Sequence, residues 1–569
     1  MKQRASQAPR MQYGYELPRS IKHSFAFDTR NENTKWKDAL EIELSTLKKL
    51  KTFKILPRGT RAPPGYKCIP IIWIFAIKMD GRHRVRMCAG GHVTAPPTSI
   101  TFSGVVEKET VRLGGWIESA NGMNMWLGDV TNAFPRAVCR EQVYFIAGPE
   151  FGDDEGCVVI IVMALYGLKT SGAAFHAYLA DILRILGFKN CYADPDAWYR
   201  AASDSAHGMY YEYLMVYVDD ILAISHHPKE IFDELQQHFE MKSVGPPDHY
   251  LGANLGTVNY NGEEFRYMAS DQYLQDALTK LEHNLGYSLK NTKIKTPTVT
   301  DFHPELDSST LLNQRDHTLY QSLIGTLQWL VTLGRIDIHY ATSKLSQYGA
   351  APRSNHLAQV IRVYTYLASN PQHKLVFDSR PRLWNKSWMT VDWQETYPNA
   401  KETIPLNMPT PRGSPVQINF WCDAAFATDG KNRRSQYGII IFLGNSPYQW
   451  VCGQLKAMET SAFGAEYTTL RMACELVVAL RYKLRMLGIP IDGPANGFVD
   501  NQAVVINSTV PESTLKKRYN FIAYHYVREL MAAGVVRLTH EPGRDNIADI
   551  LTKGVDGTTH ARLVPRILH

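Results

Sequence analysis

Two adjacent aspartates, Asp219 and Asp220, lie between two short apolar runs, residues 214–218 and 221–224. The composition of these runs favours two strands joined by a tight turn. Such a hairpin presents both carboxylates at its tip, where neighbouring like charges are costly unless a cation neutralises them. The pattern therefore predicts a metal-binding hairpin. The alternative is an ordinary aspartate-rich turn, because aspartate is a favoured turn residue.

A third acid, Asp129, follows another largely apolar run, residues 123–128, and is expected at the end of a strand. Three carboxylates at two strand ends suit two divalent cations, because Mg²⁺ prefers oxygen ligands. Two such ions about 4 Å apart can hold both the attacking and the leaving oxygen of a phosphoryl transfer. The three acids therefore favour a two-metal site for phosphoryl chemistry.

The length and composition of the chain limit the class of protein. With 569 residues it is too long for one hydrophobic core and is expected to form about three or four domains. Its 44% hydrophobic and 21% charged residues are typical of a globular protein, and its net charge of +7 is compatible with a polyanionic partner without requiring one. The eight cysteines form no Cys-x-x-Cys pair, which favours a reducing compartment. The longest apolar stretch, residues 157–165, is too short to cross a membrane.

Four further acids lie beyond a segment rich in proline, asparagine, threonine and serine, which is interpreted as a linker. Asp423 and Asp500 each end a run typical of a strand, and Asp549 lies near a C-terminal helix. Glu466 is on a long predicted helix, residues 461–487, and shares a stripe with apolar residues, so its carboxylate is expected to face the packed side. The alternative for Glu466 is a first-turn glutamate stabilised by the helix dipole.

The segments that carry these acids resemble a known family. Three boxes, Tyr217–Asp220, Asp129–Phe134 and Ala164–Lys169, are similar to those of the reverse transcriptase of copia-type LTR retrotransposons. Further boxes follow in family order at residues 36–39, 85–92, 193–196 and 320–327. Beyond the linker, Asp423 and the boxes 465–467, 500–502 and 548–553 are similar to the ribonuclease H of the same elements. The resemblance covers most of the chain.

This resemblance implies a multidomain protein of the α+β and α/β classes. The fold would be a right-hand polymerase with fingers, palm, thumb and connection, followed by an RNase H-like α/β domain. The expected divisions are a flexible N-terminal tail (1–30), fingers and palm (31–255), thumb and connection (256–370), a linker (371–415), the RNase H-like domain (416–556) and a C-terminal tail (557–569). The sequence contains no aspartic protease box and no zinc pattern of an integrase, so the chain is expected to be the C-terminal part of a longer polyprotein.

The resemblance also assigns roles to individual residues. Catalysis and metal binding are expected of Asp129, Asp219 and Asp220 in the polymerase and of Asp423, Glu466, Asp500 and Asp549 in the RNase H. Contacts to the incoming nucleotide are expected of Lys78, Arg84, Arg86, Phe134 and Lys169, with Arg86 at the phosphates and Phe134 next to the sugar. Contacts to nucleic acid are expected of Tyr250, Leu251 and Gly252, which resemble a primer-grip strand, and of the basic run Lys516, Lys517 and Arg518. For Lys78, Arg84, Arg86 and the basic run, the alternative is a solvated surface position.

The implied function is RNA-directed DNA polymerisation that copies retrotransposon RNA, with RNase H degradation of the RNA strand of the hybrid. The implied cofactor is Mg²⁺, two ions per active site, with Mn²⁺ as a substitute. The implied partners are an RNA template, a DNA primer, the RNA/DNA hybrid, dNTPs, and integrase and other polyprotein parts, with no membrane; the oligomeric state is left open. The implied location is intracellular, in a cytoplasmic virus-like particle with entry into the nucleus.

The competing interpretation is an inactive or domesticated remnant that binds nucleic acid without catalysis. Several positions depart from the family pattern, among them Met87, Cys88 and Thr170. The pair Gly114–Gly115 also lies in a predicted helix, where each glycine costs about 1 kcal/mol relative to alanine. All seven expected acids are nevertheless present, which favours an active enzyme or a recent loss of activity.

Overall fold

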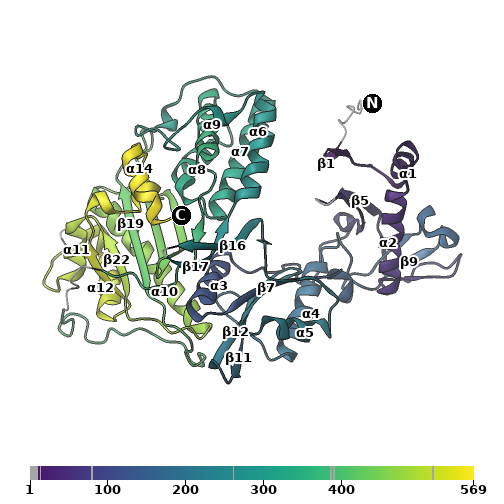
Figure 1. Ribbon diagram of the computed structural model, residues 1–569, viewed down its shortest axis with the longest axis horizontal. Helices are drawn as coiled ribbons and strands as arrows, with labels where there is room; N and C mark the ends of the chain where they lie inside the picture. Colours follow the sequence, from purple (N-terminus) through teal and green to yellow (C-terminus); the bar gives the residue numbers. More distant parts are fainter. Residues whose placement is uncertain are drawn as a thin grey trace.

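The computed structural model describes residues 10–12, 14–78, 81–260, 262–384, 388, 391–515 and 518–569. Figure 1 shows an elongated molecule with the N-terminal segments at one end and the C-terminal domain at the other. A sheet with its helices connects the two ends, and a group of helices rises above it. None of the helices in the described ranges has the length and apolar character that crossing a lipid bilayer requires.

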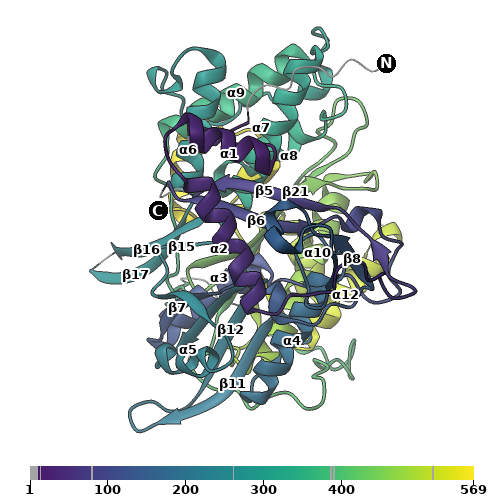
Figure 2. The same cartoon turned by 90° about the vertical axis from the view of Figure 1, so that its right-hand side faces the viewer.

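The N-terminal unit, which corresponds to the fingers, combines two helices with a sheet and a hairpin. Its elements are β1 (Met11–Gln12), β2 (Tyr15–Glu16), α1 (Ile21–Arg30), α2 (Lys35–Lys49), β3 (Phe53–Ile55), β4 (Lys67–Cys68), β5 (Ile71–Ile77), β6 (His83–Ala89), β8 (Val143–Ile146) and β9 (Val158–Ile161). Strands β3, β9, β8 and β4 form one sheet in that order, and β5 pairs with β6. Trp36, Leu40 and Leu44 recur at helical spacing and are buried on α2, which lies against β6 (Figure 2). Hydrophobic burial on one helix face therefore attaches α2 to the hairpin.

The palm is a six-stranded antiparallel sheet with helices on both faces. Its elements are α3 (Lys108–Asn121), β7 (Asn124–Val130), α4 (Ser171–Ile185), β10 (Lys189–Asn190), β11 (Ala197–Asp204), β12 (Gly208–Tyr217), β13 (Asp220–Ser225), α5 (Pro228–Gln236) and β14 (Met241–Gly245). The strand order is β10-β11-β12-β13-β7-β14. Alternate residues of β13 point to opposite faces: Ile221 lies in the same hydrophobic cluster as Phe232 of α5, whereas Leu222 lies in a different cluster, which contains Trp116 of α3.

Helix α3 contains the unfavourable pair Gly114–Gly115, and its packing explains both residues. A Cβ atom at Gly114 would lie 2.7 Å from side-chain atoms of Met215 and Ile224 in the palm sheet. A Cβ atom at Gly115 would lie 2.6 Å from the ring of Phe377. Close approach of the helix to its neighbours therefore requires glycine, and the pair is no sign of decay.

The thumb and connection consist of a small sheet and four helices. Their elements are β15 (His249–Tyr250), β16 (Ala253–Tyr260), β17 (Glu263–Ala269), α6 (Asp271–Leu285), α7 (Gln314–Thr332), α8 (His339–Ser346), α9 (Ser354–Ser369) and β18 (Leu375–Val376). In the connection between α7 and α8, Arg335 and Asp337 form a fully buried ion pair with N–O distances of 3.0 and 2.7 Å. The hydroxyl of Tyr366 donates to the same carboxylate (2.8 Å). The buried charges are thus paired and hydrogen-bonded, as burial demands.

His339, the first residue of α8, gives a stability prediction. Burial lowers its pKa to about 4, and Nδ1 is enclosed without a hydrogen-bond partner. Because the folded pKa lies below the unfolded value, the contribution of His339 is fully present above pH 6.5 and is lost as the pH falls towards 4. When the pH is lowered from roughly 7.5 to 5, the free energy of unfolding should fall in both proteins. The decrease should be about 2 kcal/mol smaller in His339→Gln than in the parent.

Urea unfolding at the two pH values measures this difference. His283→Gln, an exposed histidine on α6, is the matched control and should behave as the parent does. Equal pH-dependent losses in His339→Gln and the parent would show that His339 is protonated equally in the folded and unfolded states.

The C-terminal domain is a mixed five-stranded sheet with a long helix across it. Its elements are β19 (Ile418–Ala425), β20 (Gln436–Leu443), β21 (Ser446–Gln454), α10 (Ala462–Met486), β22 (Ala495–Val499), α11 (Gln502–Thr509), α12 (Phe521–Ala532), β23 (Val536–His540), α13 (Asp549–Thr552) and α14 (Gly557–Leu563). The order is β21-β20-β19-β22-β23; β19 to β21 are antiparallel, and β22 and β23 run parallel to β19. The architecture is thus the predicted combination of α+β and α/β domains with an RNase H-like C-terminal unit.

The expected terminal tails are partly folded. Within residues 1–30, α1 forms and buries Phe27. Within residues 557–569, α14 forms, and the backbones of His569 and Lys374 exchange two hydrogen bonds of 2.6 and 2.9 Å. Both segments carry apolar side chains that become buried, and this burial offsets the entropy lost on ordering them.

The expected linker, residues 371–415, is not a free connection. Strand β18 lies within it and pairs with β17. Further along, the carboxylate of Glu402 accepts hydrogen bonds from Arg481 (2.8 Å) and Arg485 (2.6 Å) of α10. The segment is irregular because it is rich in proline, but it is packed and ion-paired against the C-terminal domain.

Candidate active sites

The first site lies where β13 runs between β12 and β7 in the palm sheet. Asp220 is the first residue of β13, and its Cα is paired with that of Tyr217 on β12 and with that of Asp129 on β7. The turn between β12 and β13 therefore consists of Val218 and Asp219. The expectation that both aspartates occupy the turn is wrong for Asp220, because the strand register places it in β13, directly beside Asp129.

The turn itself holds Val218 in an unusual conformation. Its φ angle is 59°, in the left-handed region, which costs an ordinary L-residue roughly 1–2 kcal/mol and is rarer still for a β-branched one. The backbone N–H of Val130 donates to the carbonyl oxygen of Asp219 (2.8 Å) and ties the turn to the end of β7. Strain of this kind persists where the surrounding structure enforces a functional geometry.

Electrostatic repulsion dominates this site. Burial raises the pKa of Asp219, and the nearby carboxylate of Asp129 raises it further. Burial and the charges of Asp219 and Asp129 raise the pKa of Asp220 to about 6. One cation offsets part of this repulsion, since Lys242 Nζ lies 2.9 Å from Asp129 Oδ1. The acids therefore favour additional positive charge at the site.

Sequence reasoning missed Lys242. It lies on β14, and its Cα is paired with that of Asp129 on β7. Strand β14 is short, irregular and at the edge of the sheet, so no local pattern identifies its partner. Only the pairing register brings this ammonium group to the acids.

A second missed residue, Lys108, lies at the start of α3 and close to the same hairpin. Its Nζ is 5.2 Å from the ring centroid of Tyr217 and 4.8 Å from that of Trp329 on α7. Burial lowers the pKa of Lys108 to about 8, and the charge of Arg112 adds to this effect. The ammonium group therefore connects the β12–β13 hairpin to the thumb through two aromatic faces.

Arg86 and Phe134, which are expected to contact the nucleotide, form one cluster with Tyr166. The guanidinium carbon of Arg86 on β6 lies 4.6 Å from the ring centroid of Tyr166. The ring of Phe134 lies 4.9 Å from the same ring. The charge of Arg86 lowers the pKa of Asp219, although burial raises it overall, so the guanidinium faces the acids. Its Nε is buried without a hydrogen-bond partner, which leaves a donor available to a ligand.

The other residues expected to contact the nucleotide have different contacts. Lys169 Nζ donates to the carbonyl oxygen of Thr94 (2.6 Å), so its ammonium group supports the neighbouring loop. Arg84 lies beside Glu43, where its charge lowers the pKa of a carboxyl that burial raises. Lys78 directly follows β5, and its backbone N–H donates to the carbonyl oxygen of Arg82 (2.9 Å). The structure therefore places Arg86 near Asp219 and Phe134 against Tyr166. Burial raises the pKa of Tyr166 and the charge of Arg84 lowers it, so Arg84 is also close to this tyrosine.

The expected primer-grip residues form a tight turn between β15 and β16. Tyr250 is only 2% exposed, and its hydroxyl has no hydrogen-bond partner, so its side chain offers no surface to nucleic acid. This differs from the expectation, because the turn folds Tyr250 into the core. Leu251 and Gly252 have φ angles of 51° and 82°, and a Cβ atom at Gly252 would lie 3.3 Å from Trp329 Nε1. Gly252 is therefore required for backbone geometry.

The predicted basic contact to the hybrid is only partly within the described ranges. Lys516 and Lys517 lie outside them. Arg518 begins a short 3-10 segment that ends at Asn520. The role of this run therefore stays a prediction.

The second site lies at one edge of the C-terminal sheet. Asp423 is on β19, Asp500 directly follows β22, and Asp549 begins α13. One carboxylate oxygen from each of the three lies within 4.8 Å of the other two. Strands β19 and β22 are adjacent and parallel, so the acids at their C-terminal ends necessarily meet at the same edge.

Glu466 on α10 faces the same cluster. Burial raises its pKa to about 8, and the charges of Asp500 and Asp423 add to this effect. Asn501 Nδ2 donates to one of its oxygens (3.1 Å). Ser461 caps the N-terminus of α10, and its Oγ accepts a hydrogen bond from the backbone N–H of Gly464 (3.1 Å). This cap fixes the start of the helix and therefore the side on which Glu466 lies.

Charge accumulates at the second site as well. Burial and Asp423 raise the pKa of Asp549 to about 7. Lys553 Nζ lies 2.8 Å from Asp549 Oδ1 and reduces the repulsion. Thr552 Oγ1 donates to Asp423 Oδ2 and fixes that carboxylate. The site is thus assembled and oriented but still carries more acidic than basic groups.

The donor atoms of both sites fit a hard divalent cation. Glu466 Oε2 and Asp500 Oδ1 are buried without a hydrogen-bond partner, so they are oriented oxygen donors. Every candidate ligand in the two sites is a carboxylate, which suits Mg²⁺ and, in its place, Mn²⁺. Among the described residues, the palm acids do not meet the 4.8 Å spacing of the second cluster. In the palm, the carboxylate of Asp129 is instead ion-paired with the ammonium group of Lys242.

Comparison with known proteins supports the resemblance to this family. A family profile described as "Reverse transcriptase (RNA-dependent DNA polymerase)" matches residues 52–290. The retrovirus-related Pol polyprotein from transposon RE1 of Arabidopsis thaliana is 25% identical over 549 residues, which cover 94% of this chain and 34% of that protein. The corresponding polyprotein from transposon TNT 1-94 of Nicotiana tabacum is 22% identical over 559 residues, which cover 95% of this chain and 38% of that protein. The chain thus spans about one third of the length of these relatives.

Solved structures show more distant likeness. The foamy viral protease-reverse transcriptase in complex with double-stranded DNA has a TM-score of 0.45 and 13% identity, over 94% of this chain and 72% of that chain. LC11-RNase H1 in complex with an RNA/DNA hybrid has a TM-score of 0.20 and 18% identity, over 24% of this chain and 94% of that chain. The sequence matches, together with the boxes that carry the two acid clusters, are more informative. The chain is therefore similar over most of its length to Pol polyproteins of copia-type retrotransposons, and residues 52–290 match a reverse transcriptase family.

Proposed function

We propose that the chain is an RNA-directed DNA polymerase joined to a ribonuclease H. Its substrates would be dNTPs on an RNA template with a DNA primer, and then the RNA strand of the hybrid. The proposal rests on the presence of two separate clusters of acidic side chains in one chain. One surrounds the pairing of Asp129 with Asp220, and the other gathers Asp423, Asp500 and Asp549. Two-metal phosphoryl transfer requires such oxygen donors.

The mechanism assigns distinct tasks to the two sites. Bound Mg²⁺ would favour ionisation of the primer 3′-hydroxyl and neutralise the pyrophosphate at the first site, and would favour ionisation of water at the second. Asp129, Asp219 and Asp220 would hold the cations of the polymerase. Arg86 would bind the triphosphate from the fingers side, with Tyr166 fixing the plane of its guanidinium.

At the second site the acids have different surroundings and therefore different tasks. Asp423 is oriented by Thr552, and Asp549 is paired with Lys553. Glu466 and Asp500 have free oxygens, so they are the readiest ligands. Lys553 would neutralise the cluster before a cation binds and then move towards the phosphate of the hybrid.

Primer extension and hybrid cleavage test the proposed function. The purified full chain should extend a DNA primer on an RNA template with Mg²⁺ and dNTPs, and should cleave the labelled RNA of a hybrid. EDTA should stop both reactions, and added Mg²⁺ or Mn²⁺ should restore them. If the chain bound primed template but performed neither reaction with either metal, it would be the nucleic-acid-binding remnant instead.

Phe134 gives a prediction about sugar selectivity. Its ring lies against that of Tyr166, whose pKa is raised mainly by burial and further by the nearby charge of Asp219. At this position bulk would clash with a ribose 2′-hydroxyl. Phe134→Ala should reduce discrimination between dNTPs and rNTPs by about 10- to 100-fold, or roughly 1.4–2.7 kcal/mol. The ratio of kcat/KM values for a dNTP and the matching rNTP measures this. Phe134→Tyr keeps the bulk and should keep the selectivity; equal selectivity in Phe134→Ala and the parent would refute the role.

A further inference from the structure

A second kind of donor cluster lies at the opposite end of the palm sheet from the acids. It joins Asp204, the last residue of β11, and His207, in the turn before β12, to the segment after β13, which contains His227. One donor atom from each of the three lies within 4.8 Å of the other two. Strand β12 runs from Gly208 to Tyr217, so about 30 Å separates this cluster from the catalytic hairpin. The two sites are therefore independent.

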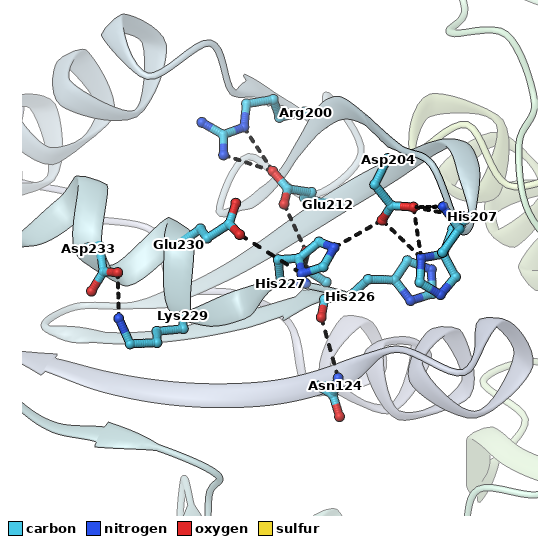
Figure 3. A network of polar contacts seen from close by, with 12 residues as sticks. Asn124, Arg200, Asp204, His207, Glu212, His226, His227, Lys229, Glu230 and Asp233 are labelled. Carbon is cyan, nitrogen blue, oxygen red and sulfur yellow. Dashed lines mark hydrogen bonds and ion pairs between the residues drawn. The ribbon is translucent and has the colours of Figure 1, made fainter.

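The side chains of His207 and His227 both contact one carboxylate oxygen of Asp204 (Figure 3). Asp204 Oδ2 lies 2.9 Å from His207 Nδ1 and 3.0 Å from His227 Nε2. The other oxygen, Oδ1, accepts from the backbone N–H groups of Ala206 (2.8 Å) and His207 (2.6 Å), which fixes the carboxylate. A tetrahedral site with ligand bonds of about 2.0–2.1 Å has ligands roughly 3.3 Å apart. The two observed N–O separations are close to this value and the third separation is within 4.8 Å, so small side-chain shifts would let the three atoms accept a cation.

Further contacts orient the two imidazole rings. The ring of His226 stacks on that of His207, with centroids 3.6 Å apart and planes 8° from parallel. The backbone N–H of His227 donates to Ser225 Oγ (2.9 Å), which donates to Glu212 (2.8 Å). The far nitrogen of His227 lies 4.0 Å from the carboxylate of Glu230. Such outer contacts hold metal-binding histidines in known sites.

We propose that Asp204, His207 and His227 form a site for a divalent transition-metal ion of the zinc class. Two imidazole nitrogens and one carboxylate oxygen suit Zn²⁺ and disfavour Mg²⁺, which prefers oxygen alone. The side chains of Asp204, His207 and His227 are 21%, 41% and 43% exposed, so water can supply the fourth ligand. The ion replaces the ring protons that otherwise face the carboxylate.

The consequence is a cross-link at the edge of the palm. The ion joins the β11–β12 turn to the segment that leads into α5, two parts of the chain that the sheet connects only through β12 and β13. Binding to the folded state alone then stabilises the protein by an amount that, above the Kd, rises with the logarithm of the metal concentration.

Cobalt and zinc binding to the full chain tests the proposal. Co²⁺ titration of metal-free parent protein should show d–d absorption of a nitrogen- and oxygen-ligated ion without sulfur charge transfer. His207→Ala/His227→Ala should raise the Kd for Zn²⁺ at least about 100-fold, and Asp204→Asn at least about 10-fold. Millimolar Mg²⁺ should not displace the ion from the parent.

The matched control is His92→Ala/His283→Ala, which removes two exposed histidines elsewhere and should bind Zn²⁺ as the parent does. Circular dichroism checks that each variant is folded, and Asp204→Asn, which keeps the size of the side chain, covers the case in which the double variant does not fold. X-ray absorption of the zinc-loaded parent should show two imidazole ligands. Equal Kd values in the parent and in folded Asp204→Asn, or a zinc environment that contains sulfur, would overturn the proposal and leave a hydrogen-bonded turn.

Discussion

Replacement of Asp219 by asparagine is expected to reduce primer extension at least about 1000-fold while leaving hybrid cleavage within about twofold of the parent. A 1000-fold loss corresponds to roughly 4 kcal/mol of transition-state stabilisation. Asparagine keeps the shape of the side chain but removes the charge that would hold the cations. Asp219 lies in the turn beside Asp129, where burial and repulsion raise its pKa, so cation binding there depends on the full set of charges.

Single-turnover extension of a primed RNA template measures the first activity, and cleavage of a preformed hybrid measures the second. Asp181→Asn, an exposed position on α4 of the same palm, is the matched control and should retain both activities. Extension by Asp219→Asn at more than about one tenth of the parent rate would show that Asp219 holds no essential cation.

Replacement of Asp500 by asparagine is expected to have the reverse effect. Hybrid cleavage should fall at least about 1000-fold, whereas extension should stay within about twofold. Asp500 Oδ1 is buried without a hydrogen-bond partner, and the carboxylates of Asp423 and Asp549 lie within 4.8 Å, so this oxygen is placed to bind a cation. An amide in its place supplies a weaker ligand and donates hydrogen bonds where acceptors are needed.

The same two assays on Asp500→Asn complete the comparison, with Asp492→Asn as an exposed control in the same domain. The control matters because the domains are closely packed: Arg112 of α3 donates to the carbonyl oxygen of Tyr448 on β21 (2.6 Å). Loss of both activities in a folded Asp500→Asn or Asp219→Asn variant would mean that the sites do not act separately. Each variant should therefore be checked by circular dichroism before the rates are compared.

Local sequence patterns predicted the elements that carry the site. The apolar runs around Asp219 and Asp220 became β12 and β13, and the run before Asp129 became β7. The predicted helix over residues 461–487 agrees closely with α10, and its apolar stripe placed Glu466 on the packed side. These features are encoded locally, because strand alternation, helical spacing and capping depend on neighbouring residues.

Contacts between distant segments were not predictable in this way. The exclusion of Asp220 from the turn and the pairing of Lys242 with Asp129 depend on strand register, which a short edge strand does not encode. The burial of Tyr250 depends on how the β15–β16 turn packs against its surroundings. Similarly, the partners of Glu402 are on a helix about eighty residues away in the chain.

The sequence by itself was enough to recognise the resemblance to the family and to predict an order of domains and the acids of two sites, because these lie in short boxes whose residue types and spacing are informative. Only the tertiary structure decided which basic groups neutralise those acids, why α3 needs two glycines, and that Asp204, His207 and His227 meet at one point. The physical reason is that charge pairing, close packing and ligand convergence depend on distances in space, and these distances arise only when separate strands and helices pack together.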